Sequence, residues 1–299
     1  MPSQCWCCCP RLLLVVLPSL QGVGRATALL FARKGWNVVV AARDPAKLQY
    51  VADDCAAAAG RQGASLAVPC DVTDERQVKN LVTTAMARYQ DVDCVISNAG
   101  VMARGPFLQV PAAEANRLMQ TNYLGAYIVA QAFIPFLIKE AQRKQGVDRP
   151  SLIMVNSFGG KVSCPAPGEG IHWDYQVPMK SMSAFTASKY ALMGLTEAIR
   201  AELEPLGIHV GQVHPGVVKS NHLERTTFYG GTDEADERRA FRQAVRALPI
   251  SQTPQEVADA IYNAAATKQN DVVVGMPFAM ADLAYRMTGL NPTALPTPW

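Results

Sequence analysis

Two glycines lie where an apolar segment passes into a helical pattern, in the stretch Gly22-Val23-Gly24-Arg25-Ala26. Glycine at such a turn lets the backbone approach a ligand closely, and the first N–H groups of the following helix attract an anion. A strand, a glycine turn and a helix in this order are typical of a site for the pyrophosphate of a dinucleotide. Glycine turns into helices are also common in ordinary structure, so the motif gains its weight from other motifs further along the chain.

The second apolar segment, Asn37–Ala41, is followed by Ala42, Arg43 and Asp44. In dinucleotide sites an acidic side chain near this point binds a ribose 2′-hydroxyl, whereas an arginine accommodates a 2′-phosphate. Here Ala42 followed by Arg43 favours a 2′-phosphate. The sequence therefore predicts NADP(H) in preference to NAD(H) as the cofactor, the alternative for Arg43 being a solvated loop residue.

Six further motifs occur along the chain, and with them it resembles the short-chain dehydrogenase/reductase family from about Gly22 to Gly275. The motifs are Cys70-Asp71-Val72-Thr73, Ser97-Asn98-Ala99-Gly100, Thr121-Asn122, Asn156-Ser157, Lys189 and His214-Pro215-Gly216-Val217-Val218-Lys219-Ser220. One such motif is a weak signal, whereas all six in the family's order would require six coincidences together.

The resemblance implies a nicotinamide dinucleotide bound at the carboxyl ends of the strands. In the family, Asp71 would meet the adenine, Asn98-Ala99-Gly100 would lie beside the cofactor, and Pro215-Gly216 would touch the nicotinamide. Together, the glycine turn, the arginine after the second strand and the resemblance predict a set of cofactor-binding residues. They are Gly22, Val23, Gly24, Arg43, Asp71, Val72, Asn98, Ala99, Gly100, Lys189, Pro215, Gly216, Val218 and Ser220. A small carbonyl or alcohol would be the second ligand.

The chemistry implied by the resemblance is hydride transfer between the cofactor and a carbonyl or alcohol carbon. Ser157 would hydrogen-bond the substrate oxygen, Lys189 would bind the nicotinamide ribose, and Asn122 would help to hold a water relay to Lys189. The family's proton donor is a tyrosine four residues before the lysine, on the same helix face. This chain has Phe185 at that position.

Phe185 preserves the packing of a tyrosine but has no proton to give. Loss of a positioned general acid typically lowers the rate by ~10²–10⁴. Tyr190 is not expected to replace it, because the next residue along a helix from Lys189 points about 100° away. Two functions stay open: an NADP(H)-dependent oxidoreductase weakened at Phe185, and a catalytically inactive relative that binds NADP(H) as a sensor or scaffold.

The chain also departs from the family at Pro18 and in the spacing of its catalytic residues. Pro18 stands where the family has the first glycine of its turn, and proline has a fixed φ and no N–H. Ser157 and Phe185 are 28 positions apart, about twice the family's separation, and we assign the excess to an inserted loop at 164–176. Residues 1–21 are largely of types with pyrimidine-rich codons. Our hypothesis is that they are a gene-assembly artefact supplying or replacing the first strand.

Short apolar segments alternate with longer helical patterns along the chain, as in a parallel sheet whose strands are buried on both faces. The predicted strands are Leu12–Leu17, Asn37–Ala41, Ser65–Pro69, Val92–Ser97, Ser151–Asn156, Gly207–Val213 and Asp271–Gly275. The predicted helices are Gly24–Lys34, Pro45–Ala59, Asp74–Tyr89, Ala113–Lys139, Ser183–Leu206 and Pro254–Lys268. The fold class is α/β: one Rossmann-type doubly wound parallel sheet, in strand order 3-2-1-4-5-6-7, with helices on both faces. The domain covers 22–277, and 278–299 is a C-terminal extension.

Composition excludes several other classes of protein. The chain has 299 residues with a net charge of +3, 49% hydrophobic and 18% charged residues, which argues against disorder and against a nucleic-acid or membrane surface. No apolar run of about 20 residues is evident, so no membrane span is expected. The eight cysteines and four histidines lack metal-ligand spacing, so no metal site is expected. We expect a cytoplasmic location, with an organelle such as the chloroplast as the alternative, and the resemblance implies a homodimer or homotetramer.

Overall fold

The computed structural model describes residues 13–17, 22–145, 148–158, 164–165, 172–173, 181–220, 225–230, 238–239, 243 and 251–275. Its main sheet is parallel and contains seven strands: β1 (Leu13–Leu17), β2 (Asn37–Ala42), β3 (Ser65–Pro69), β4 (Cys94–Ser97), β6 (Ser151–Val155), β9 (His209–Pro215) and β11 (Asp271–Val274). The spatial order is β3-β2-β1-β4-β6-β9-β11, which confirms the predicted doubly wound order.

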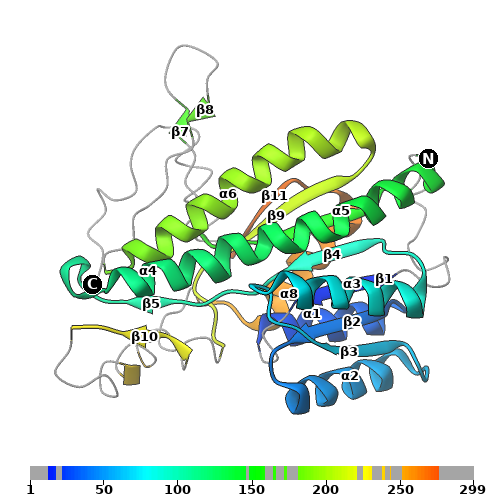
Figure 1. The fold of residues 1–299 in the computed structure, drawn as a ribbon, viewed down its shortest axis with the longest axis horizontal. Coiled ribbons are helices and arrows are strands. Elements are labelled where there is room, and N and C mark those ends of the chain that lie inside the picture. The colour runs from blue at the N-terminus through cyan, green and yellow to red at the C-terminus, as the bar shows by residue number, and fades with distance from the viewer. Residues whose placement is uncertain are drawn as a thin grey trace.

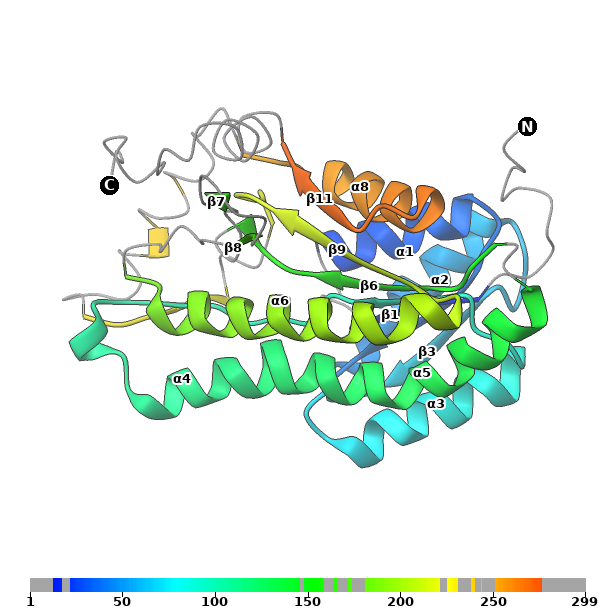
Figure 2. The same cartoon turned by 90° about the horizontal axis from the view of Figure 1, so that it is seen from above.

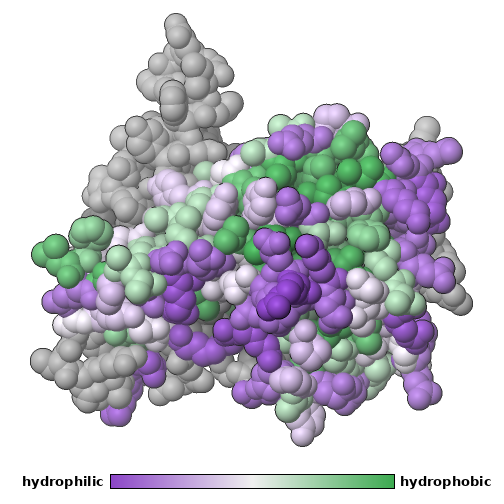
Figure 3. All heavy atoms as spheres, in the orientation of Figure 1, coloured by the Kyte–Doolittle hydropathy of each residue, from purple (hydrophilic) through white to green (hydrophobic). Residues whose placement is uncertain are grey.

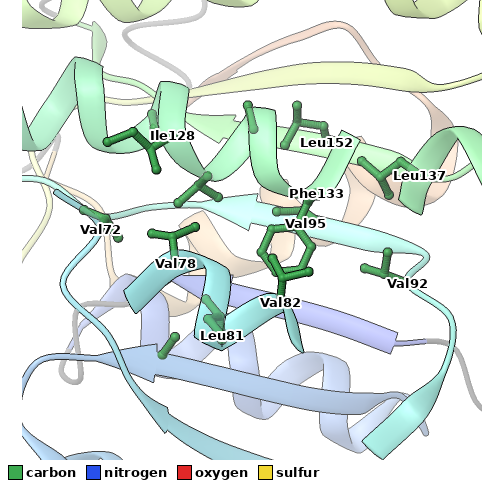
Figure 4. Packing of buried hydrophobic residues seen from close by; sticks show 14 of the residues in the cluster. Val72, Val78, Leu81, Val82, Val92, Val95, Ile128, Phe133, Leu137 and Leu152 are labelled. Atoms are coloured by element: carbon green, nitrogen blue, oxygen red, sulfur yellow. The ribbon is translucent and has the colours of Figure 1, made fainter. Parts of the chain in front are cut away.

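Helices cover both faces of this sheet (Figures 1 and 2). On one face lie α1 (Val23–Arg33), α2 (Pro45–Ala59) and α8 (Pro254–Thr267), and on the other α3 (Glu75–Tyr89), α5 (Gly125–Lys144) and α6 (Ser183–Leu203). Phe133 of α5 is completely buried between the sheet and α3, among Val82 and Val95 (Figure 4). Burial of apolar surface on both faces is the main force that holds this arrangement.

The N-terminal segment supplies the first strand. Leu13–Leu17 pairs with β2 on one side, in the register Leu13↔Asn37, and with β4 on the other, in the register Leu14↔Cys94. The apolar run before the glycine turn therefore occupies the centre of the sheet. Its origin in a mis-assembled gene stays a hypothesis, which sequencing of the transcript across the codon for Gln21 tests. Pro18 and the extension 278–299 lie outside the described residues.

The long helix expected at Ala113–Lys139 is interrupted. It consists of α4 (Ala112–Met119), a π-helical turn at Gln120–Leu124 and α5, which continues to Lys144. A π turn contains one extra residue and is frequent at functional sites. Here it contains Asn122, so the irregular turn coincides with a predicted site residue.

The same stretch bears on the expectation of no membrane span. Among the described helices, Ala112–Lys144 is long and apolar enough to cross a membrane by length and composition, with a mean hydropathy of 1.3 in its most apolar window. However, 44% of that window is buried inside the fold, as expected of the core helix of a Rossmann domain. The finding is therefore weak evidence for a span.

Shorter elements complete the fold. The 3-10 turn Glu204–Leu206 extends α6, and Phe107–Gln109 forms another between β4 and α4. β5 (Ala103–Arg104) pairs in parallel with β10 (Thr227–Phe228). In the predicted insertion 164–176, the described residues are an antiparallel pair, β7 (Cys164–Pro165) and β8 (His172–Trp173).

Candidate active site

The sequence motifs meet at one edge of the sheet because the strands are parallel. The carboxyl ends of β2, β4, β6 and β9 are Ala42, Ser97, Val155 and Pro215, and each precedes a predicted site segment. In doubly wound folds this edge is where ligands bind. The geometry of the segments decides what the edge can hold.

The glycine turn has the form that an anion site requires. Gly22 caps α1 with φ 79° and ψ −136°, a conformation that residues with a β-carbon rarely adopt. It has no side chain to cap the helix, and the first intrahelical bond runs from the Ala26 N–H to the Gly22 carbonyl, at 3.0 Å. The preceding N–H groups have no partner within the helix and suit a pyrophosphate.

Arg43 lies just beyond β2 and is the basic group expected for a 2′-phosphate. Its side chain is 75% exposed, and its Nη1 is 3.9 Å from Asp71 Oδ2. An exposed ion pair of this length contributes little, so Arg43 can turn toward an anionic ligand at small cost. Asp71 is itself fixed, because its Oδ1 accepts hydrogen bonds from the Thr73 N–H at 3.0 Å and the Thr73 hydroxyl at 2.8 Å.

Lys189 is a buried cation at the centre of the site. It is 5% exposed, and its Nζ donates to the carbonyl oxygen of Val155, the last residue of β6, at 3.1 Å. Burial lowers the pKa of Lys189 to about 8. A β-carbon placed on Gly100 would lie 3.8 Å from Lys189 Nζ, so the loop after β4 passes directly beside the ammonium group.

Asn122 joins that loop to the helix carrying Lys189. Its Oδ1 accepts from the Val101 N–H at 2.8 Å, and its Nδ2 donates to the Val101 carbonyl at 3.0 Å and to Ser188 Oγ at 2.9 Å. The Ser188 hydroxyl in turn donates to the Phe185 carbonyl at 2.7 Å. The Asn122 side chain is thus fully engaged in holding the site together. The role of Ser188 was not predicted from the sequence, although its position next to Lys189 could have indicated it.

Ser157 lies two residues beyond β6 and is partly exposed. The strand end before it is held by Lys189 through Val155, and its own carbonyl oxygen is 3.4 Å from His214 Nδ1. The structure therefore brings Ser157 and Lys189 to the same strand end. Asn122 and Gly100 lie beside Lys189, as the 3.4 Å from a β-carbon on Gly100 to Asn122 Oδ1 shows.

Phe185 lies in an apolar cluster where the resemblance implies a proton donor. It is 7% exposed and clusters with Met102, Ala103, Leu118 and Met182, and partly buried Val217 and Tyr229 pack against this cluster. The cluster therefore joins the loop after β4 to the loop after β9 by apolar packing. Tyr190 is 37% exposed on the solvent side of α6, which agrees with the expectation that it does not replace the acid.

The Pro215–Ser220 segment is held by a residue that the sequence did not single out, Gln252. The Gln252 Oε1 accepts from the Gly216 N–H at 3.0 Å, and its backbone bonds Val217 and Lys219 at 2.7 and 2.8 Å. Only a long-range contact reveals this role, since Gln252 is 36 residues from Gly216. Val72, assigned to the cofactor, packs against Gly125 at the start of α5.

Comparison with known proteins identifies the family to which the chain belongs. A family model described as enoyl-(acyl carrier protein) reductase matches residues 19–275. The chain belongs to the short-chain dehydrogenase/reductase family. Its doubly wound sheet is the Rossmann fold of the solved structure from that family that it resembles.

Individual relatives of this short-chain dehydrogenase/reductase are distant. It is 31% identical over 252 residues to "Probable oxidoreductase EphD" of Mycobacterium tuberculosis, covering 83% of this chain but only 38% of that relative. It is 28% identical to "Dehydrogenase/reductase SDR family member 7B" of Danio rerio, over 93% of this chain and 78% of the relative. The crystal structure of a short-chain dehydrogenase/reductase from Burkholderia phymatum in complex with NAD is similar in fold, with a TM-score of 0.75, 21% identity and 92% and 91% of the two chains covered.

The cysteines that the structure describes in full are structural. Cys55, Cys70 and Cys94 are buried free thiols, and burial raises their pKa to about 12, 11 and 12. Thiols this reluctant to ionise are poor nucleophiles and poor metal ligands. Within the described part of the chain, no three His, Cys, Asp or Glu side chains are grouped to hold a metal.

Proposed function

We propose that this short-chain dehydrogenase/reductase is an NADP(H)-dependent oxidoreductase that acts on the carbonyl or alcohol group of a small molecule, with its activity weakened at Phe185. The observation that carries the proposal is the buried Lys189 ammonium group, held at the end of β6 beside Gly100. Burying a cation is costly, and a buried cation at the carboxyl edge of a parallel sheet is a candidate functional group. Among the described residues, each catalytic position expected from the family except the tyrosine has its residue type.

The bound cofactor would supply or accept the hydride. The chain's residues would do the rest: the N–H groups at the start of α1 would bind the pyrophosphate, and Ser157 would hydrogen-bond the substrate oxygen. Lys189, with a pKa of about 8, would be protonated for most of the time at neutral pH and would bind the nicotinamide ribose. Asn122 keeps the loop after β4 against α6 so that these groups share one geometry.

Preference for NADP(H) is supported by Arg43. It comes after the small Ala42 at the end of β2, and its guanidinium is exposed, where a 2′-phosphate attached to the adenosine ribose would meet it. A charge-assisted hydrogen bond to phosphate is about twice as strong as a neutral one. The nearby Asp44 side chain caps α2 by accepting a hydrogen bond from the Lys47 N–H.

The packing of Phe185 favours a second candidate function, an NADP(H)-binding sensor or scaffold without turnover. Replacing Phe185 by tyrosine decides between the two. If the remaining site is competent, Phe185→Tyr raises carbonyl reduction with NADPH by about 10²-fold or more, the usual contribution of a positioned acid. Phe185→Leu, which changes the packing without adding a hydroxyl, is the matched control and gives no gain. No gain for Phe185→Tyr across a carbonyl panel, with NADPH binding intact, supports the sensor or scaffold.

We propose further that the protein is cytoplasmic and forms a homodimer or homotetramer. The buried free thiols Cys55, Cys70 and Cys94 suit a reducing compartment. Apolar side chains gather over α5 and α6 on the face shown in Figure 3, where a second copy could pack. Sedimentation of the purified chain tests the oligomer, and a monomer at micromolar concentration contradicts it.

A further inference from the structure

The backbone ladder between β6 and β9 ends just before Ser157. Its last bond runs from the Asn156 N–H to the Val213 carbonyl, at 2.8 Å. Pro215 closes β9, and proline has no N–H with which to continue the ladder. The residue expected to hold the substrate oxygen thus lies where strand pairing has stopped.

Beyond the end of the backbone ladder, a side chain makes the next contact between β9 and the segment after β6. His214 Nδ1 is 3.4 Å from the Ser157 carbonyl oxygen, and the imidazole is completely buried. Nδ1 carries the proton in this contact, because a carbonyl oxygen can only accept. The bond fixes the backbone of Ser157, and through it the direction in which the hydroxyl leaves the chain.

The other side of the imidazole faces Asp271. Its Oδ1 lies 3.5 Å from His214 Nε2, and its Oδ2 lies 3.3 Å from Arg200 Nη1. Arg200 is on α6, the helix that carries Lys189, and it also donates to the carbonyls of Val210 at 2.7 Å and Asn270 at 2.8 Å. The contacts therefore run from Ser157 through His214 and Asp271 back to the catalytic helix.

We propose that His214 is a positioning residue that fixes Ser157 relative to Lys189. The catalytic importance of this role rests on the proposed function, whereas the restraint on the backbone does not. His209 offers a matched control. It lies on the same strand, is equally buried and also bonds β6, but at the opposite end, through Ser151 Oγ at 3.3 Å.

The test compares His214→Leu, which loses the donor, with His214→Asn, whose amide nitrogen can take the place of Nδ1, and with His209→Leu. Amide hydrogen exchange is measured on the peptide that contains Asn156–Phe158 and needs no turnover. We expect His214→Leu to speed exchange there by about tenfold and His214→Asn to restore most of the protection. His209→Leu is expected to lower Tm but to leave exchange at Asn156–Phe158 unchanged. Equal effects of His214→Leu and His209→Leu on this peptide overturn the proposal.

Turnover supplies the second measurement, made in the Phe185→Tyr background. There, His214→Leu should lower kcat about tenfold while the Kd for NADPH changes less than twofold, because only the substrate's partner has moved. A fall in cofactor affinity that matches the fall in kcat indicates general damage and overturns the positioning role.

If Phe185→Tyr has no turnover, the proposed function fails, but amide exchange still decides whether His214 restrains Ser157. If His214→Leu does not fold, His214→Phe, which fills the buried site without a donor, replaces it, with about tenfold faster exchange expected and no change overturning the proposal.

Discussion

Lys189 and Lys268 are both buried lysines, but their ammonium groups have different hydrogen-bond partners. Lys189 Nζ donates to one carbonyl oxygen at the ligand-binding edge, whereas Lys268 Nζ donates to the Arg149 carbonyl and to Ser151 Oγ at the opposite edge. Burial lowers the pKa of both to about 8. Both ammonium groups are therefore desolvated, but Lys189 lies among the predicted site residues, whereas Lys268 joins loops at the other edge of the sheet.

Replacing Lys189 by methionine should stabilise the protein and abolish its function. The folded pKa of about 8 lies below the usual 10.5, so between these pH values the unfolded chain binds a proton that the folded chain releases. Stability from this group therefore rises with pH across that window, and at pH 7 the full penalty, about 3 kcal/mol at most, is present. We expect Lys189→Met to raise the unfolding free energy at pH 7, by an amount that shrinks by pH 10, and to weaken NADPH binding.

Urea unfolding at pH 7 and pH 10 measures this gain, with Lys268→Met as the control that should leave NADPH binding unchanged. A loss of stability on Lys189→Met at pH 7 would contradict a desolvated ammonium group.

His209 predicts how the fold responds to acid. Its Nε2 is 3.1 Å from the Gln269 carbonyl, and burial lowers its pKa from 6.5 to about 4. Between these values the unfolded chain binds a proton that the folded chain excludes, so stability falls as the pH falls through the window, by up to about 3 kcal/mol. Unfolding free energies at pH 7 and pH 4.5 should show a smaller loss for His209→Gln than for the natural chain. If the natural chain and His209→Gln lose the same unfolding free energy between pH 7 and pH 4.5, the pKa of His209 is not lowered by folding.

At the scale of elements, the π turn at Gln120–Leu124 couples α4 and α5 to α6. It presents Asn122 to the Val101 backbone and to Ser188, so one side chain joins the loop after β4 to α6. Asn122→Leu keeps the volume but leaves buried Val101 and Ser188 groups without this partner, which should cost about 2–3 kcal/mol.

NADPH affinity should also fall in Asn122→Leu, because the Gly100 loop is released. Denaturation and cofactor titration measure the two effects. Asn116→Leu, on α4 outside the π turn, is the control expected to change neither by more than a few tenths of a kcal/mol. Unchanged affinity in Asn122→Leu would show that the loop is held by other contacts.

The elements also show what the sequence can and cannot predict. Strands such as Ser65–Pro69 and the helix Pro45–Ala59 have the predicted bounds, since continuous apolar runs and a proline at a helix start are local signals. The π turn was missed because the apolar period of a helix does not reveal one extra residue in a turn. The roles of Gln252 and His214 were missed because their partners are distant in sequence.

At the scale of the whole molecule, the parallel sheet converts motifs spread over about 200 residues into one site. The segments after β2, β4, β6 and β9 have little in common in sequence, but their strands end at the same edge. The family motifs were therefore enough to predict which segments meet at this edge. Phe185 is the departure that the described residues show directly.

The most direct test of the account is a fluorescence titration of the purified chain with NADPH and with NADH. The account predicts saturable binding, at least about tenfold tighter for NADPH, because Arg43 gains a charge-assisted hydrogen bond to the 2′-phosphate. Arg43→Ala should remove most of that preference, whereas Lys47→Ala, which removes an exposed cation four residues away, should keep it. Binding of neither nucleotide would contradict a cofactor site at the glycine turn, and tighter binding of NADH would contradict the role of Arg43.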